Sequence, residues 1–267
     1  MTLLLILVGT LLAGIGSVWL AAWLSFGVFS RYTQHMLSLA AGALLATGFL
    51  KLLPEAFESG IEPHALFVTL LIGLVFFFLL DKAELWHHGH EHHNGHTDGH
   101  AHAHGHHHHH HHDEATPGSW AVLTGDSLHC FGDGILIASA FMADVQLGAI
   151  AALAVLAHEV PHHMGDLVVL RQGQRSRHAA LIKVSMAGAV TALGGLVGYW
   201  VVDWLHDQLP FFLVVASSSF IYVALADLIP QLQKRLSTRE TLAQVFWLAL
   251  GIAGVLAVAA LTGSHLH

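Results

Sequence analysis

Two short stretches of the sequence carry residues that bind metal ions, at spacings that place them together on a helix. The first stretch contains His129 and Asp133, and the second contains His158 and His162. The residues of each pair are four apart, so their side chains would share one face of a helix. Two such helices, facing each other, would surround one cation with three imidazoles and a carboxylate. That ligand set suits zinc and related first-row metals.

Further polar residues lie beside these four. Cys130, Glu159 and His163 each follow one of them in the sequence, about 100° around the helix. They belong either to a second, adjacent site or to helix packing, and for Cys130 we favour a buried apolar role. A carboxylate in an apolar medium needs a partner, so we assign Glu159 as an accessory metal ligand. Asp126 precedes His129 by three residues and is placed to orient its ring.

Proline and glycine residues accompany these ligands. Pro161 lies between the two histidines of the second stretch. It removes a backbone hydrogen bond from its helix, which frees the carbonyl of Ala157. Gly132, Gly134 and Gly165 lack side chains, and we expect them to let helices approach closely.

The elements that must hold these residues are long and apolar. Of the 267 residues, 54% are hydrophobic and only 10% are charged, whereas a soluble domain has about 25% charged residues. This composition excludes a disordered protein, a basic nucleic-acid binder and an ordinary soluble enzyme. Apolar runs of membrane length lie at 3–24, 33–54, 63–83, 119–142, 146–170, 179–204, 209–232 and 241–263.

Segments of this kind must be helical inside a bilayer, because each backbone polar group has to be satisfied within its own segment. We therefore predict an all-α polytopic membrane protein with eight transmembrane helices. The first span is long and has no basic residues before it, so we interpret it as a retained helix and not as a cleaved signal peptide. Ionisable residues within such spans are costly, which makes those of spans four and five functional candidates.

The basic residues predict the orientation of the protein. Lys51 lies near one face of the predicted membrane, and the other nine lie on or beside the connections that follow spans one, three, five and seven: Arg31, Lys82, Arg171, Arg175, Arg177, Lys183, Lys234, Arg235 and Arg239. Basic connections stay in the cytoplasm, so we expect both termini on the non-cytoplasmic side, most simply of the plasma (inner) membrane. The opposite connections are acidic, and they either concentrate cations or are simply solvated.

Residues 84–118 form the one long polar segment. It holds 16 of the 26 histidines, between His87 and His112, and few apolar residues. Such a segment cannot bury a core, so we predict a disordered cytoplasmic tract that binds metal weakly at many positions. It would act as a buffer or a sensor and not as the transport site. This divides the chain into helices one to three (1–83), the histidine-rich tract (84–118) and helices four to eight (119–267).

An internal similarity links the second and seventh spans. Phe49-Leu-Lys-Leu-Leu-Pro54 ends the second span, and Ala224-Leu-Ala-Asp-Leu-Ile-Pro230 ends the seventh. These two spans run in opposite directions through the predicted membrane. An inverted repeat of three helices on each side of a central pair, a 3+2+3 arrangement, would give this relation.

The polar stretches resemble a known family. His129-Cys-Phe-Gly-Asp133-Gly resembles the span-four signature of the ZIP family of metal-ion transporters, usually His-Asn-Phe-x-Asp-Gly. His158-Glu-Val-Pro-His162-His-Met-Gly-Asp166 is similar to the span-five signature of its histidine-rich subfamily, usually His-Glu-x-Pro-His-Glu-x-Gly-Asp. The stretches at 52–56 and 222–230 are similar to other parts of that subfamily. The resemblance covers all eight spans and the histidine-rich tract.

The resemblance implies movement of Zn²⁺, and sometimes of Fe²⁺, Mn²⁺ or Cd²⁺, into the cytoplasm. It also implies a metal site between spans four and five, with His129, Asp133, His158 and His162 as its primary ligands. Glu159 matches a ligand of a second site, which Asp133 and His162 would bridge. Members of the family are commonly homodimers, and an elevator-like or rocking motion is the expected mechanism.

Three positions depart from the family pattern. Cys130 stands where the family usually has asparagine, and His163 stands where it usually has a second glutamate. Thr191 stands where members of other subfamilies have a glutamate that completes the second site.

Three other functions compete with transport into the cytoplasm. His158-Glu-Val-Pro-His162 satisfies the His-Glu-x-x-His motif of zinc proteases, but Pro161 lies inside it and no Leu-Asp-Gly element supplies a third ligand. A cation diffusion facilitator would export metal, but those proteins resemble six-span chains. A metal sensor without transport is the third. We expect no enzymatic activity, no cofactor and no nucleic-acid partner; divalent ions and the lipid bilayer are the partners.

Overall fold

The computed structural model describes residues 1–25, 33–89, 117–172, 177–232 and 237–263, and within these ranges the regular elements are helices and none is a strand. By length and composition alone, seven of the described segments could cross a membrane: Thr2–Ser25, Thr33–Glu58, Pro63–Lys82, Val145–Val168, His178–Trp204, His206–Leu232 and Thr238–Leu261. Each of them coincides with a predicted span.

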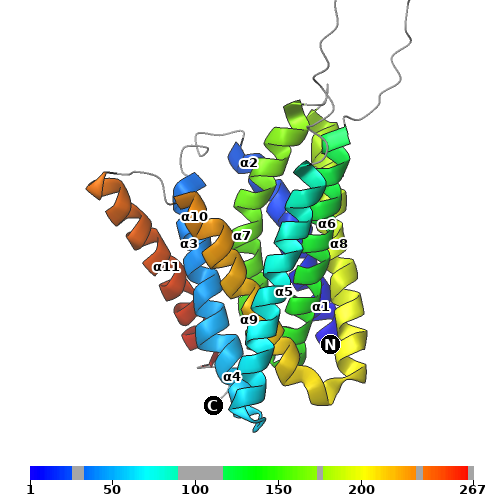
Figure 1. Cartoon of the computed structure of the whole chain (residues 1–267), viewed down its shortest axis with the longest axis vertical. Coiled ribbons are helices and arrows are strands. Elements are labelled where there is room, and N and C mark those ends of the chain that lie inside the picture. Colours follow the sequence, from blue (N-terminus) through cyan, green and yellow to red (C-terminus); the bar gives the residue numbers. More distant parts are fainter. Residues whose placement is uncertain (26–32, 90–116, 173–176, 233–236, 264–267) are drawn as a thin grey trace, which may run out of the picture.

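The fourth predicted span differs from the other seven in being less apolar. It corresponds to α6 (Pro117–Ala143), which has 27 residues but is not among the seven apolar segments. The helix carries Asp126, His129 and Asp133, so the polar residues that make it a candidate metal-binding element also reduce its apolar character. It nevertheless passes through the bundle. In Figure 1, the start of α1 and the end of α11 lie at the same, lower end of the bundle.

In the described part of the chain, three of the passes through the bundle are interrupted by a turn of π-helix. The helices in these residues are α1 (Thr2–Leu11), η1 (Leu12–Gly16), α2 (Ser17–Ser25), α3 (Thr33–Thr47), η3 (Gly48–Leu52), α4 (Leu53–Glu58), α5 (Pro63–Gly89), α6, α7 (Val145–Gln172), α8 (Arg177–Trp204), η5 (His206–Gln208), α9 (Leu209–Tyr222), η6 (Val223–Leu228), α10 (Ile229–Leu232) and α11 (Thr238–Gly263). Of the η elements, η1, η3 and η6 are π-helical and η5 is a 3₁₀ turn.

The two stretches that resemble each other in sequence also share a local structure. The π-helical turn η3 is followed by Leu53-Pro54, and the π-helical turn η6 is followed by Ile229-Pro230. Turns of this kind are rare and occur mostly as single bulges within α-helices. The similarity therefore extends from the residues to the backbone.

Close packing against α8 fixes the position of α6. A side chain at Gly134 would collide with the backbone of Thr191 and Gly195, and one at Gly194 would collide with the backbone of Phe131. The two helices are thus in backbone contact, as small residues permit in membrane helices.

The other two glycines singled out in the sequence do not have this role. The space in front of Gly132 and Gly165 is open for at least 4 Å. The expectation of close helix approach is therefore confirmed for Gly134 and wrong for Gly132 and Gly165. Pro161 lies inside α7, which continues as a helix on both sides of it.

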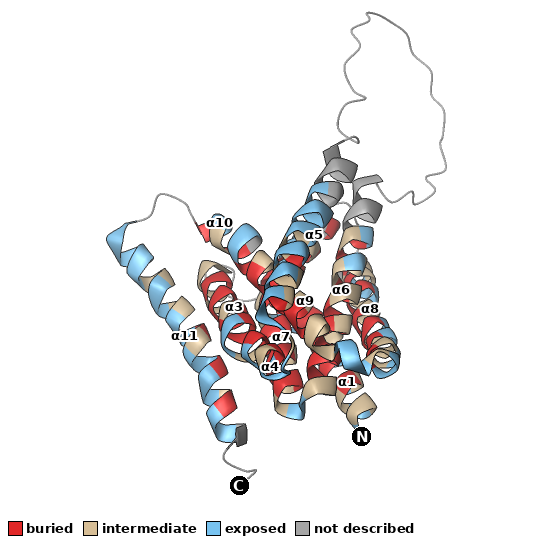
Figure 2. Ribbon diagram, turned by 60° about the horizontal axis from the view of Figure 1, so that its bottom comes forward, coloured by how far each residue is buried: buried red, intermediate tan, exposed pale blue. Residues whose placement is uncertain are grey.

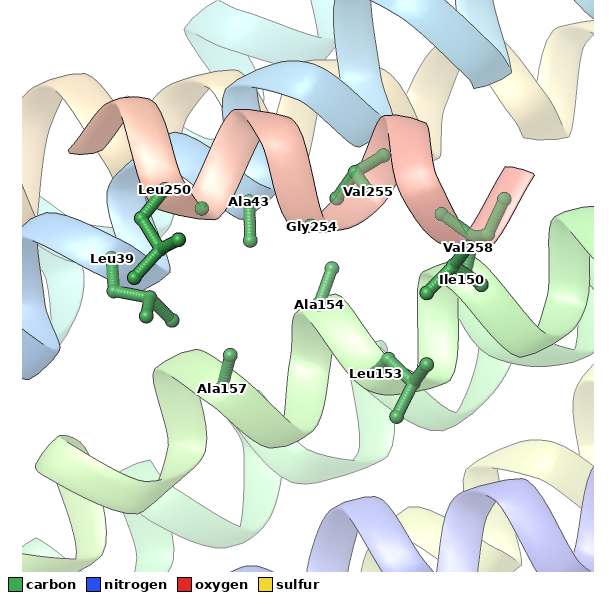
Figure 3. Close-up of a pocket in the computed structure, with 11 residues that line it drawn as sticks. Leu39, Ala43, Ile150, Leu153, Ala154, Ala157, Leu250, Gly254, Val255 and Val258 are labelled. Carbon is green, nitrogen blue, oxygen red and sulfur yellow. The ribbon is translucent and has the colours of Figure 1, made fainter. Parts of the chain in front are cut away.

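Burial is uneven across the bundle. The buried core includes Leu44, Ile137 and Phe220 from α3, α6 and α9. Figure 2 shows α11, at the edge of the bundle, mostly exposed. An apolar groove with a volume of about 320 Å³ lies between α11, α3 and α7, lined in part by Leu39 and Leu250 (Figure 3). One side of α7 therefore faces an apolar space.

Candidate metal centre

Four metal-binding side chains converge between α6 and α7. They are His129 and Asp133 of α6 and His158 and Glu159 of α7, which we call the first group. The Nε2 atom of His158 lies 3.3 Å from Asp133 Oδ2, 3.2 Å from Glu159 Oε1 and 3.3 Å from His129 Nε2. His129 Nε2 lies 3.2 Å from Glu159 Oε1 and 3.8 Å from Asp133 Oδ2. Three of the four residues are buried, and the His129 side chain is 28% exposed.

These separations match the corners of a coordination tetrahedron. Ligand atoms about 2.1 Å from a tetrahedral zinc ion lie roughly 3.4 Å from one another. The five distances above fall near that value, and all four atoms lie within 4.8 Å of one another. Asp133 Oδ2 and Glu159 Oε1 are buried and form no hydrogen bond. A cation bound between these atoms would satisfy them, since buried polar atoms generally have a partner.

The backbone of α7 orients one of the ligands. His158 Nδ1 lies 3.4 Å from the carbonyl oxygen of Ala154, one turn earlier in the helix. A proton on Nδ1 points at this carbonyl, which leaves the lone pair of Nε2 for the first group. Metal-binding histidines usually have an outer partner of this kind.

The structure places His162 apart from the first group. Its Nδ1 atom lies 3.3 Å from Asp166 Oδ2 and 3.7 Å from Asp126 Oδ1, and these three residues form what we call the third group. The imidazole ring stacks on that of His129, with 5.5 Å between ring centroids. Of the five ligands expected from the sequence, four therefore converge and His162 lies beside them with different partners.

A further group lies between these two. Asp126, Cys130, Glu159 and His163 are all buried and bring one ligand atom each within 4.8 Å of the others; we call them the second group. Glu159 belongs to the first and second groups, and Asp126 to the second and third. The sequence left open whether Cys130 and His163 belong to an adjacent site or to helix packing. The feature that pointed to an adjacent site was their position directly after the predicted ligands His129 and His162.

Asp126 has a different place from the one expected. Its carboxylate lies 3.7 Å from Cys130 Sγ, His162 Nδ1 and His163 Nε2. It does not serve as the outer partner that orients His129, because that ring instead faces Glu159 and His158. A spacing of three residues puts Asp126 on the same side of α6 as His129, but one turn nearer the start of the helix.

The three groups are stacked along the bundle. The helix α6 begins at the upper end in Figure 1, whereas α7 ends there. Among the ligands of α6, Asp133 is therefore the nearest to the lower end, and among those of α7, Asp166 is the nearest to the upper end. The His162 side chain is 38% exposed, against 28% for His129. The first and third groups thus each include a partly exposed histidine, whereas the second group between them is wholly buried. Most of the histidine-rich tract predicted at 84–118, namely residues 90–116, lies outside the part of the chain that the structure describes.

Comparisons with known proteins identify the family. The family model of the ZIP zinc transporter matches residues 1–259. Human zinc transporter ZIP4 is 28% identical over 259 residues, covering 78% of this chain and 40% of that protein. Human zinc transporter ZIP10 is 31% identical over 152 residues, covering 57% of this chain and 18% of that protein. Zinc transporter ZIP10 of Danio rerio is 32% identical over 114 residues, covering 43% of this chain and 14% of that protein.

The chain thus spans less than half the length of these relatives. The family match, however, extends over both helices that carry the three groups, over six of the seven apolar segments and over all but the last two residues of the seventh. Together with the long apolar helices, it makes the protein an integral, multi-pass membrane protein. A family of transporters also favours transport over the protease chemistry that the His-Glu-x-x-His motif suggested. On these grounds the chain belongs to the ZIP zinc transporter family.

Proposed function

We propose that this protein moves divalent metal ions, chiefly Zn²⁺, across the membrane into the cytoplasm. The ion would pass through the first group, between the fourth and fifth membrane passes, α6 and α7. The observation that carries this proposal is the set of five ligand-to-ligand distances of 3.2–3.8 Å, close to the edges of a zinc tetrahedron. Fe²⁺, Mn²⁺ and Cd²⁺ are further cargoes that such ligands accept.

The stacked groups suggest the route. At membrane depth a polar imidazole faces protein or water and not lipid, so the partial exposure of His129 and His162 supports a wet path beside them. The third group lies toward the end of the bundle where α5 ends and α6 begins. The positive-inside pattern makes that end cytoplasmic. An ion bound at the first group would then leave past Asp126, His162 and Asp166.

The architecture we propose is eight transmembrane helices in a 3+2+3 arrangement with an inverted repeat. The matched π-helical turns η3 and η6 support a relation between the first three and the last three passes. Both termini would lie outside the cytoplasm, in the plasma (inner) membrane, and the protein would form homodimers. The proposed units keep the boundaries 1–83, 84–118 and 119–267, although the helix α5 extends to Gly89 and α6 begins at Pro117.

An intramembrane zinc protease is the alternative, and the geometry disfavours it. In the His-Glu-x-x-His mechanism both histidines bind one ion, and the glutamate remains free to act as a base on bound water. Here His158 and His162 belong to different groups, and Glu159 Oε1 lies 3.2 Å from both His129 and His158. These distances support a role for the glutamate as a ligand and not as a free base.

Uptake into proteoliposomes tests the proposal. Purified protein in sealed vesicles is exposed to Zn²⁺, Fe²⁺, Mn²⁺, Cd²⁺ and Ca²⁺, with and without a pH gradient. We expect zinc uptake above that of empty vesicles and no calcium uptake, because calcium prefers six to eight oxygen ligands. Zinc uptake no greater than in empty vesicles, from correctly inserted protein, would refute transport; cleavage of a membrane substrate would favour the protease.

The histidine-rich tract gives a second arm of this experiment. We propose that residues 84–118 buffer or sense metal in the cytoplasm. A variant lacking 87–112 is expected to keep most of the maximal uptake rate while releasing metal differently on the cytoplasmic side. Complete loss of uptake in an inserted deletion variant would instead make the tract part of the pathway.

A further inference from the structure

Two hollows follow one another along the contact between α3 and α11. The first lies where both helices begin, at the upper end in Figure 1, and has a volume of about 450 Å³; His35, Arg239 and Ala243 form part of its lining. The second is the apolar groove that also borders α7, lined in part by Leu39 and Leu250 (Figure 3). A polar hollow thus precedes an apolar one along the same pair of helices.

The same face of each helix lines both hollows. In α3, Leu39 follows His35 by four residues, which puts the two side chains on one side of the helix. In α11, Leu250 follows Ala243 by seven residues, or about two turns. The two hollows therefore lie in line on one side of the helix pair, and we call them together the α3–α11 track.

A cationic side chain lies at the upper end of the track. Arg239 is exposed, and in the part of the chain that the structure describes no ion pair engages it. The neighbouring Glu240 is turned onto Ser237, whose backbone N–H and hydroxyl donate hydrogen bonds of 2.8 and 2.7 Å to its carboxylate. The guanidinium is therefore available to a phosphate group, which it can bind through two parallel hydrogen bonds.

An aromatic pair lies between the polar and the apolar end of the track. The indole of Trp247 stacks on the imidazole of His35, with 5.7 Å between the ring centroids. Tryptophan is enriched at the level of lipid headgroups, because its ring is mostly apolar and its N–H is polar. The pair thus marks the depth at which the surroundings of the track change from polar to apolar.

The length of the track fits one lipid molecule. Arg239 precedes Leu250 by eleven residues, or about 16 Å of helix, and half the hydrocarbon core of a bilayer is about 15 Å thick. An acyl chain whose phosphate lies at Arg239 would therefore reach the groove with its far end. The described residues that line the groove are apolar or glycine, so hydrocarbon can enter it without leaving a polar side chain unsatisfied.

Two glycines of α11 explain why space remains beside a close helix contact. A side chain at Gly251 would collide with the backbone of Leu39, so this glycine lets α11 touch α3. A side chain at Gly254 would meet nothing within 4 Å. Gly254 lines the groove (Figure 3), and it is therefore a position at which the groove can be filled without a collision.

We propose that the α3–α11 track binds one glycerophospholipid, with its phosphate at Arg239 and one acyl chain ending in the groove beside α7. The lipid fills the space that the described side chains of α3, α7 and α11 leave open. It comes from the leaflet at the upper end of the bundle in Figure 1, which is the cytoplasmic leaflet in the orientation proposed above. Anionic lipids of that leaflet are attracted to arginine at the membrane surface.

The test is native mass spectrometry of the purified full chain, titrated in detergent with dioleoyl phosphatidylglycerol. We expect one lipid to bind more tightly than those that follow it onto the general apolar surface. The variant Gly254→Leu fills the groove and should weaken this first binding by roughly tenfold, the effect of removing about two methylene groups from apolar contact. Equal binding to Gly254→Leu and to the unmutated protein would overturn the proposal.

The matched control for this variant is Ala249→Leu. It adds a side chain of the same kind to an exposed position of α11 that does not line the groove, so the first lipid should bind as it does to the unmutated protein. A loss in Ala249→Leu as large as that in Gly254→Leu would place the lipid outside the groove and contradict the proposal.

A second pair of variants tests the phosphate end. Arg239→Gln should weaken the binding of dioleoyl phosphatidylglycerol by roughly tenfold, but leave that of dioleoylglycerol, which has no phosphate, nearly unchanged. The control is Lys82→Gln, at an exposed position near the end of α5, which should change neither. Equal weakening by Arg239→Gln and Lys82→Gln would show a general attraction of charge and overturn the assignment of Arg239.

The same spectra distinguish a lipid from a second copy of this chain. If the groove were a contact between copies, Gly254→Leu would lower the fraction of dimer without changing lipid binding, and this outcome would refute the lipid site. Lipid binding is also separate from the proposed transport. His158→Ala removes a member of the first group and should still bind the lipid normally, whereas a loss of lipid binding in that variant would contradict a separate site.

Discussion

The two sides of α7 have opposite characters. Toward α6, the helix presents His158, Glu159 and the other polar ligands, with separations of 3.2–3.8 Å to their neighbours. Toward α11, it presents Ala154 and Ala157 to an apolar groove of about 320 Å³ (Figure 3). One side is closely matched to a small ion, and the other leaves room beside the helix.

This difference shows where positional accuracy is needed. A tetrahedral site tolerates only small errors in ligand position, and here the partner helix α6 is held by backbone contact between Gly134, Gly194 and their neighbours in α8. The groove side has no such requirement, because dispersion contacts between apolar groups are not directional. The helix α7 is thus positioned through its polar side, and substitutions on its two sides should have very unequal effects.

The largest effect is expected on the polar side, for His158→Ala. This residue contacts all three other members of the first group, so its loss should reduce zinc uptake to the background of empty vesicles. The measurement is uptake by proteoliposomes with equal amounts of inserted protein, with His178→Ala as the control. Near-normal uptake by His158→Ala would remove the first group from the pathway.

External acid should weaken zinc uptake by the unmutated protein. Zinc binds the unprotonated nitrogen of histidine, so protons compete with it, and an unperturbed imidazole is protonated near pH ~6.5. Bound metal displaces protons, so apparent zinc affinity should fall as external pH falls through that region. The check is uptake against zinc concentration at several external pH values. An affinity that stays constant between acidic and neutral pH would shift the main role to Asp133 and Glu159.

A smaller and different effect is expected for His162→Ala. If His162 acts in the third group, its loss should slow release and lower the maximal rate of uptake, but leave the zinc concentration for half-maximal uptake nearly unchanged. If it is instead a ligand of the first group, as the family resemblance implies, its loss should match that of His158→Ala. Parallel uptake curves for the two variants decide between these positions.

The smallest effect is expected on the groove side, for Ala157→Val. The added methyl groups enter the apolar space toward α11, so apparent zinc affinity should change by less than roughly twofold, as for substitutions that disturb no specific contact. The measurement is the same uptake curve. A loss as large as that of His158→Ala would mean that the groove side also positions the ligands.

Much of the fold could be predicted because membrane spans are marked by apolar length alone. The run predicted at 209–232 coincides with the pass from Leu209 to Leu232, and that at 63–83 falls within α5. The π-helical turns could not be predicted, since a bulge changes the backbone hydrogen bonds without changing the apolar pattern. The fourth span was predicted at 119–142 as an apolar run like the others, although the composition of α6 is less apolar than that of the seven other passes.

Candidate metal-binding residues could be named from the sequence, but the way in which they group could not. A spacing of four residues indicates a shared helix face, and on this basis His129 and Asp133 were correctly paired. They do not give the axial offset between two antiparallel helices, and four residues advance a helix by about 6 Å. At the level of His158 the partners on α6 are His129 and Asp133, whereas one turn further along α7 the partner of His162 is Asp126.

The π-helical turn η3 has a consequence for changes in chain length. Such a turn holds one more residue than an α-helical turn, so α4 is rotated by about 100° relative to a plain continuation of α3. Deleting one residue from Gly48–Leu52 would remove the bulge and also shorten the chain by one residue, and the two resulting rotations cancel. The buried Leu53 and Ala56 would therefore keep their places in the core. The same deletion in the plain α-helical part of α3 would instead leave the bulge in place and rotate Leu53 and Ala56 away from the core by about 100°.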